Sequence, residues 1–274
     1  MFYAKEAILH FSAVNFRFIQ TLVADRVFTI KLNRPEKRNA FTPLMVKEIA
    51  YALEYAQSNP YIWCVLIEAA GPVFCSGMDL NVFQNEELDE KNETLPAAQK
   101  EVNFGDAFKN LTKPSVCLVN GPVLGGGFLI IGGCTFVIAT ENSRFELPEV
   151  KRGIFPMQVM ATLLKIIPPR KVLEMCILAK SYSCNEALEL GLVTHFATAE
   201  TLIQKKNDLI QSIIENSPFA IQKGIEAFYS LSDVVENERY AFLLEKLKLI
   251  KDSEDAREGL AAFKDKREPL WKNR

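Results

Sequence analysis

The chain has 274 residues, of which 49% are hydrophobic and 24% are charged, and its formal net charge is −2. The length allows one large domain or two modest ones, and the composition is that of a globular rather than a disordered protein. The balanced charge argues against nucleic acid or an anionic membrane surface as a general partner.

The number and placement of the cysteines and histidines exclude further kinds of site and catalysis. The six cysteines are scattered, mostly within apolar runs, and form no C-x-x-C pair, which favours reduced, buried thiols over disulfides or a zinc site. The N-terminus carries Glu6 and no long apolar stretch, so we expect neither a signal peptide nor a transit peptide, and a cytoplasmic location. With only His10 and His195 present, Ser-His-Asp and Cys-His catalysis are disfavoured, and general acid–base work falls to carboxylates.

In chain order, the pattern predicts an α/β part (1–197) followed by an all-helical part (198–274). The predicted elements are two strands within 17–33, a helix from Thr42-Pro43 to about 57, strands at 64–68, 114–119 and 135–139, helices at 98–111, 157–167, 170–179 and 185–190, a strand at Gly191-Leu-Val, helices at 200–215, 218–230 and 233–250, and a short basic tail from Glu258. Residues 84–100 are acidic and polar, and we interpret them as a mobile surface segment or lid. Glycine at the strand ends predicts a ligand at that edge of the sheet.

The run from Asn120 to Ile130 holds three consecutive glycines, 125–127, between a buried strand and a helix start. Glycines leave the backbone bare, and a helix start presents unpaired N–H groups that can hold a developing negative oxygen. The alternative is that the glycines only make a tight turn. The run does not fit the dinucleotide pattern G-x-G-x-x-G, because Ile130 occupies the third glycine position, and no P-loop lysine follows.

A membrane span is a rival interpretation of 114–140, since this stretch carries no charge and is long enough to cross a bilayer. Asn120, Pro122 and several glycines in its middle argue against a spanning helix, as does the composition of the rest of the chain.

Several motifs in order resemble the crotonase superfamily, the enoyl-CoA hydratases and isomerases, over roughly residues 20–270. The motifs are Arg34-Pro-x-x-x-Asn39-Ala40, Phe74-Cys-Ser-Gly77-Met-Asp79-Leu80, Asn120-Gly-Pro-x-Leu-Gly-Gly-Gly127, Arg144-Phe-x-x-Pro148-Glu149, Ala187-Leu-x-x-Gly191-Leu-Val193 and Glu258-Gly-x-x-Ala-Phe-x-x-Lys266-Arg267. The resemblance implies an α/β fold, a spiral of ββα units with a C-terminal helical trimerisation region, assembled as a homotrimer or a dimer of trimers. It also implies an acyl-CoA thioester substrate and no further cofactor, because coenzyme A is part of the substrate.

The resemblance assigns the oxyanion hole to the backbone N–H groups of Met78 and Gly126, and the catalytic carboxylate to Glu149. Substrate-binding positions that follow from it are Arg38, Ala40, Ser76, Asp79, Leu80, Gly125 and Leu129. It also places Lys266 near a CoA phosphate. The alternatives are core packing for the Met78 side chain, packing for Cys75 and Ser76, and solvated charges for Arg38 and Lys266.

The sequence departs from the hydratase pattern at one position. Hydratases of this family use two glutamates twenty residues apart, and here those positions hold Leu129 and Glu149. One carboxylate in a partly apolar site suits movement of a proton between C2 and C4 of an enoyl thioester, so Δ3,Δ2-enoyl-CoA isomerisation is favoured. Hydration, other one-carboxylate chemistries of the family and a non-catalytic acyl-CoA-binding protein are the alternatives.

Two further interpretations complete this site. Glu146 is the fallback base, because Glu149 has structural alternatives such as capping or pairing with Lys151 or Arg152. Candidates for lining the acyl pocket are Phe83, Phe155, Met157 and Met160.

Overall fold

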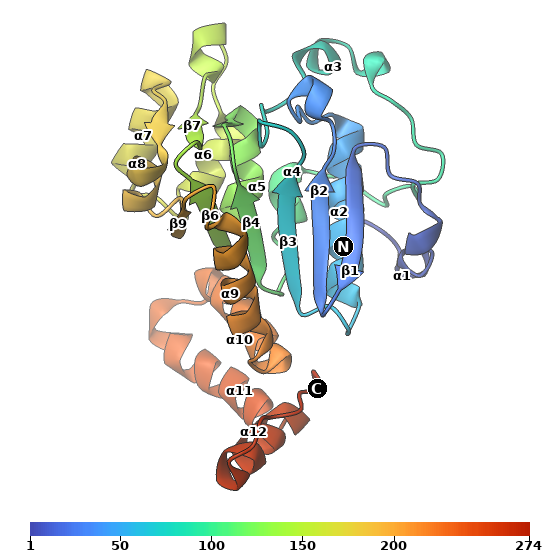
Figure 1. The fold of residues 1–274 in the computed structure, drawn as a ribbon, viewed down its shortest axis with the longest axis vertical. Helices are drawn as coiled ribbons and strands as arrows, with labels where there is room; N and C mark the ends of the chain where they lie inside the picture. Colours follow the sequence, from blue (N-terminus) through green and yellow to red (C-terminus); the bar gives the residue numbers. More distant parts are fainter.

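The computed structural model describes all residues from 1 to 274, and a six-stranded sheet lies at its centre (Figure 1). The strand order β1-β2-β3-β4-β6-β9 follows the chain; β1 is antiparallel to β2, and every other neighbouring pair is parallel. The strands of this sheet are β1 (Ile19–Ala24), β2 (Val27–Leu32), β3 (Cys64–Ala69), β4 (Ser115–Val119), β6 (Phe136–Thr140) and β9 (His195–Ala197).

Helices cover both faces of this sheet, as the α/β prediction requires (Figure 1). On one face, α2 (Pro43–Ser58) begins at Thr42, whose side chain accepts a hydrogen bond from the Met45 N–H, and Pro43 occupies the first helical position. On the other face, α9 (Leu202–Ile214) buries Leu202 and Ile210 against the strands. The predicted division into an α/β part (1–197) and a helical part (198–274) stays a prediction. The first helix of the second part, α9, packs on the sheet of the first.

A smaller sheet carries the glycine-rich turn. It consists of β5 (Val123–Leu124), β7 (Arg144–Glu146) and β8 (Tyr182–Ser183), with β7 in the middle. A 3-10 turn at Gly125–Gly127 leads from β5 into α5 (Phe128–Gly133). The apolar stretch 114–140 is thus divided among β4, β5, α5 and β6, and no helix of the chain is both long and apolar enough to cross a bilayer.

The remaining helices include three that extend below the sheet in Figure 1, α10, α11 and α12. The bounds are α1 (Lys5–Ile8), α3 (Leu80–Gln84), α4 (Phe104–Ala107), α6 (Met157–Leu163), α7 (Pro169–Leu178), α8 (Cys184–Glu189), α10 (Pro218–Ser230), α11 (Arg239–Lys251) and α12 (Glu254–Asp265). Buried Asp255 ties this helical region together, because its carboxylate accepts hydrogen bonds from Ser217 and from the Lys272 and Asn273 amides.

The expected basic tail from Glu258 is wrong over its first part, since residues 258–265 lie in α12. The N-cap Ser253, followed by Glu254 and Asp255 in the first turn, is the sequence signal that indicates this helix.

Two other expected elements differ from the structure. The strand predicted at Gly191-Leu-Val lies instead at 195–197, because the Leu192 and Val193 amides bond back to the Ala187 carbonyl and close the end of α8. The predicted helix 98–111 contracts to α4, because the Gln99 amide pairs with the Phe2 carbonyl along the N-terminal segment.

The segment predicted as a mobile lid, 84–100, is anchored along part of its length. Asp89 accepts a hydrogen bond from the Leu44 amide at 2.8 Å, in the first turn of α2. Asn92 donates to the Asn15 carbonyl and to buried Glu48 of α2. The anchored part therefore belongs to the layer formed by α2 and the N-terminal segment.

Candidate active site

The glycine-rich turn lies against the segment that precedes Met78. The Leu124 amide donates to the Cys75 carbonyl at 2.8 Å, so the two backbones run side by side. A Cβ atom on Gly77 would lie 3.1 Å from the Leu124 carbonyl oxygen and 3.4 Å from the Gly126 nitrogen, and Gly77 has φ +88°. Only glycine allows this approach, which makes the Met78 and Gly126 peptide units neighbours.

Both of these peptide units carry a free donor. Met78 lies outside the helices and strands, and its N–H donates no hydrogen bond within the chain. Gly126 is the second residue of the 3-10 turn, a position whose N–H has no partner within the turn itself. The Met78 side chain is 42% exposed, so it does not fill the core. Two neighbouring unpaired amides form a site that can donate two hydrogen bonds to one oxygen atom.

Glu149 lies next to this turn and starts the 3-10 turn that follows Pro148. A Cβ atom on Gly125, which has φ +51°, would lie 3.0 Å from the Glu149 carboxylate oxygen Oε1. The other oxygen, Oε2, is buried and has no hydrogen-bond partner. Burial raises the pKa of Glu149, an effect that its own amide and the charge of Arg152 partly offset.

The fallback base is engaged elsewhere. Glu146 accepts a hydrogen bond from the Lys151 ammonium at 2.7 Å, so it already has a cationic partner. Glu149 makes no ion pair with Lys151 or Arg152, and only its own amide and the charge of Arg152 act on its carboxylate. Of the two carboxylates, only that of Glu149 has a buried oxygen without a partner.

Leu129 occupies the first turn of α5 and is 3% exposed. Its side chain faces Gly105 of α4, where a Cβ atom would lie 3.9 Å from Leu129 Cδ2. The position that holds a carboxylate in two-glutamate hydratases is therefore an apolar contact in this chain. Among the proposed pocket residues, Phe155 and Met160 pack against the core, whereas Phe83 and Met157 are exposed.

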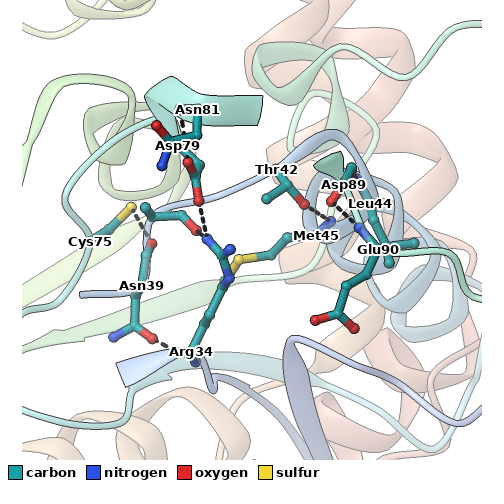
Figure 2. Close-up of polar contacts among 11 residues, drawn as sticks. Arg34, Asn39, Thr42, Leu44, Met45, Cys75, Asp79, Asn81, Asp89 and Glu90 are labelled. Carbon is teal, nitrogen blue, oxygen red and sulfur yellow. Dashed lines mark hydrogen bonds and ion pairs between the residues drawn. The ribbon is translucent and has the colours of Figure 1, made fainter. Parts of the chain in front are cut away.

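The loop that contains Arg38 and Ala40 is fixed by a partly buried ion pair (Figure 2). Arg34 Nη1 donates to Asp79 Oδ2 at 2.7 Å and to the Ala40 carbonyl at 2.9 Å, and the two side chains are only 12% and 10% exposed. Burial alone would raise the pKa of Asp79, but the hydrogen bond and charge of Arg34 and the amides of Asn81 and Val82 lower it. The Asp79 carboxylate is therefore engaged in hydrogen bonds within the protein.

Asn39 completes this loop. It is fully buried and accepts a hydrogen bond from the Arg34 amide (Figure 2). Its side-chain amide donates to the Ala70 and Val73 carbonyls at 2.8 Å. Arg34 and Asn39 belong to the first family motif, but their part in holding the loop was not predicted from the sequence. The sequence feature that could have indicated this role is the presence of polar side chains beside Pro35, in a loop between two buried strands.

The structure places most of the predicted residues together. Those gathered around the glycine turn or the adjoining loop are Arg38, Ala40, Ser76, Met78, Asp79, Leu80, Gly125, Gly126 and Glu149. The Ser76 amide donates to the Arg38 carbonyl, while the Arg38 side chain is exposed. Lys266 follows α12, which lies at the opposite end of the molecule from this turn (Figure 1).

A family model described as enoyl-CoA hydratase/isomerase matches residues 23–274. The chain belongs to the enoyl-CoA hydratase/isomerase family. This confirms the resemblance on which the site was predicted.

Curated relatives in this family act on several CoA esters. The chain is 29% identical to the enoyl-CoA hydratase EchA19 of Mycobacterium tuberculosis, over 89% of this chain and 92% of the relative. It is 30% identical to a carnitinyl-CoA dehydratase of Escherichia coli (90% and 95%) and 28% identical to a mevalonyl-coenzyme A hydratase of Aspergillus fumigatus (90% and 91%).

Solved structures of the enoyl-CoA hydratase/isomerase family share the fold. Human enoyl Coenzyme A hydratase domain-containing protein 3 matches with a TM-score of 0.84 at 25% identity, over 93% of this chain and all of that one. An enoyl-CoA hydratase from Mycobacterium tuberculosis matches with a TM-score of 0.80 at 25% identity, over 94% and 99%. The predicted crotonase-like α/β fold with C-terminal helices is confirmed.

Proposed function

We propose that this family member transfers a proton on an acyl-CoA thioester through an enolate held by the Met78 and Gly126 N–H groups. The observation that carries the proposal is Glu149, whose buried Oε2 has no partner and whose carboxylate lies beside Gly125, next to the two unpaired amides. A thioester oxygen placed between the amides would become more negative as the α-proton leaves. Each such donor contributes on the order of 3 kcal/mol to stabilising that charge.

The proposed reaction is Δ3,Δ2-enoyl-CoA isomerisation, in which Glu149 removes the C2 proton and returns it at C4. Its carboxylate is a stronger base than an exposed one, because burial raises its pKa. Buried Leu129 supports isomerisation, because no carboxylate at that position is available to position water. No cofactor other than the CoA of the substrate is needed for this step.

Hydration of a 2-enoyl-CoA is the second candidate. It is favoured by the relatives, which are named hydratases and a dehydratase. Hydration would require a group other than Leu129 to hold the attacking water.

Ultraviolet absorbance of the conjugated thioester separates the two reactions. With purified protein, absorbance that rises on a 3-enoyl-CoA establishes the isomerase, and absorbance that falls on a 2-trans-enoyl-CoA establishes the hydratase. Glu149→Gln should lower either activity by at least about a thousandfold while the affinity for the CoA ester is kept. An active Glu149→Gln variant would show that the base is another residue.

If the absorbance changes with neither substrate, other acyl-CoA esters should be tested next. Exchange of the α-proton of a bound saturated acyl-CoA with deuterium from D₂O then distinguishes an enzyme with an untested substrate from a non-catalytic binding protein.

We also propose that the protein is a cytoplasmic homotrimer or dimer of trimers. The support for assembly is the number of exposed apolar side chains on the C-terminal helices. They include Phe228, Tyr240, Leu244, Leu247, Leu249, Leu260 and Phe263. A face of this kind is typical of an interaction surface.

A further inference from the structure

We propose that Phe41 is a positioning residue that holds both halves of the oxyanion hole in register, its main chain fixing Met78 and its ring fixing Gly126. The inference rests on the proposed function, because it assigns a role within the same site. Phe41 follows the Arg34–Ala40 loop and is 4% exposed.

The main chain of Phe41 brackets Met78. Its N–H donates to the Gly77 carbonyl at 2.9 Å, and its carbonyl accepts from the Asp79 N–H at 2.9 Å. The Gly77 carbonyl and the Met78 N–H belong to one trans peptide unit and therefore point in opposite directions. Because the Gly77 carbonyl is bonded to the Phe41 N–H, the Met78 N–H points away from Phe41 and does not take part in this pairing.

The ring of Phe41 abuts Gly126 on the other segment. A Cβ atom on Gly126 would lie 2.5 Å from Phe41 Cζ and 2.7 Å from Cε1, so the Cζ–Cε1 edge of the ring lies against the glycine. Phe104 of α4 supports the ring edge-to-face, with ring centroids 5.0 Å apart. Since Gly126 has no side chain of its own to pack, the neighbouring ring limits how far its peptide unit can move.

Truncation of the ring tests this role. Phe41→Ala keeps the main-chain bonds that fix Met78 but opens space beside Gly126, so that the second donor loses its support. We expect kcat to fall about 10- to 100-fold, with KM for the CoA ester within about threefold of wild type. Phe41→Leu, which fills part of the space, should recover part of the loss.

Phe28→Ala is the matched control. Phe28 lies in β2, is fully buried, and packs on Phe11 and Tyr55 on the α2 side of the sheet. Its loss should lower stability as much as Phe41→Ala does. Its kcat, corrected for folded protein, should stay within about twofold of wild type. If both variants lose kcat equally, the effect of Phe41 is only structural and the inference is overturned.

A spectroscopic readout avoids turnover altogether. The probe is a saturated short-chain acyl-CoA carrying ¹³C at the thioester carbonyl, whose stretching band moves to lower wavenumber when two donors polarise it. Wild type should show this movement, Phe28→Ala should keep it, and Phe41→Ala should lose most of it. If Phe41→Ala keeps the full movement, Phe41 does not position the donors.

The same measurement separates the two proposals. If the wild-type band does not move on binding, the oxyanion hole itself is wrong and the proposed function falls with it. If Phe41→Ala does not fold, Phe41→Leu decides, with an intermediate band position expected.

A second pair of variants tests the contact directly. Gly126→Ala should collide with the ring, and adding Phe41→Ala should restore part of the lost kcat. If the two effects multiply instead, the ring and Gly126 do not act as a unit.

Discussion

At the scale of single residues, Glu149 combines features that oppose stability and favour chemistry. A buried carboxylate oxygen without a hydrogen bond costs folding free energy, and a structural residue would be expected to find a partner. Glu146, three residues earlier, has found one in Lys151. The contrast supports the proposal that Glu149 is kept available for a substrate proton.

The pKa of Glu149 predicts how activity depends on pH. Burial raises it above 4.5, and the base works only as a carboxylate, so kcat/KM should rise with pH along an acidic limb whose midpoint lies above 4.5. The measurement is kcat/KM against pH on the substrate found active. A midpoint at or below 4.5 would contradict the buried environment.

The same shift has a consequence for stability. The folded carboxyl group holds its proton more tightly than the unfolded one, so its contribution to stability falls as pH rises from about 4.5 through the raised pKa. Glu149→Gln should therefore melt at a higher temperature than wild type at pH 7, and the difference should shrink as the pH approaches 4.

At the scale of elements, the Arg34–Asp79 pair joins the loop after β2 to the start of α3. Arg34 also bonds the Ala40 carbonyl, next to Phe41, and Asp79 caps α3 by accepting from the Asn81 amide. The ion pair therefore links the two segments from which the Met78 amide takes its orientation.

Asp79→Asn tests this link. Asn is as good an N-cap as Asp, so α3 keeps its cap, while the partly buried Arg34 loses its counter-charge. We expect a loss of about 2–3 kcal/mol in the free energy of unfolding. Lys171→Gln, which breaks the exposed pair with Glu174, should change it much less.

Chemical denaturation of both variants at pH 7 and at pH 3 provides the measurement. Because the pKa of Asp79 is lowered in the folded state, its contribution is present above its ordinary pKa and is lost as pH falls through the lowered value. The penalty for Asp79→Asn should therefore shrink at the lower pH. A penalty equal to that of Lys171→Gln at pH 7 would mean that the pair does not hold the loop.

The sequence predicted the elements whose signals are local. The cap at Thr42-Pro43, the buried run of β4 and the glycines of the turn all act within a few residues, and each element appeared where it was expected. The contraction of 98–111 to α4 could not be predicted in this way, because the competing bond comes from Phe2, nearly a hundred residues away.

At the site, too, features with local signals could be predicted and contacts between distant residues could not. The turn and Glu149 followed from the motifs, but the placement of the Phe41 ring over Gly126 depends on a contact between residues 85 positions apart. No periodicity or propensity reports such a contact.

At the scale of the whole molecule, the C-terminal helices are the least covered part. No residue of α11 is buried, although it carries Leu243, Leu244, Leu247 and Leu249. An isolated helix of this composition would gain from burying these leucines against a partner.

Leu244→Lys should weaken assembly. The chain has a mass of 30.9 kDa, and light scattering behind size exclusion should give about three or six times that mass for the wild type. The variant should shift toward the single-chain mass, because a charge on a buried interface is costly. Glu245→Gln changes the net charge by the same amount on an exposed side chain and should leave the mass unchanged. A wild type of single-chain mass would overturn the proposed assembly.

The strand order of the central sheet also bears on how the chain folds while it is being synthesised. Each strand after β1 pairs with the strand of this sheet that precedes it along the chain, so the sheet can grow outward from β1 as each new strand leaves the ribosome. The residues of the proposed site lie between 34 and 149, and they are all present when nearly half of the chain is still unmade. The hydrogen bond from Asn273 to the Pro60 carbonyl joins residues 213 positions apart, so it can form only after all strands of the sheet have been made.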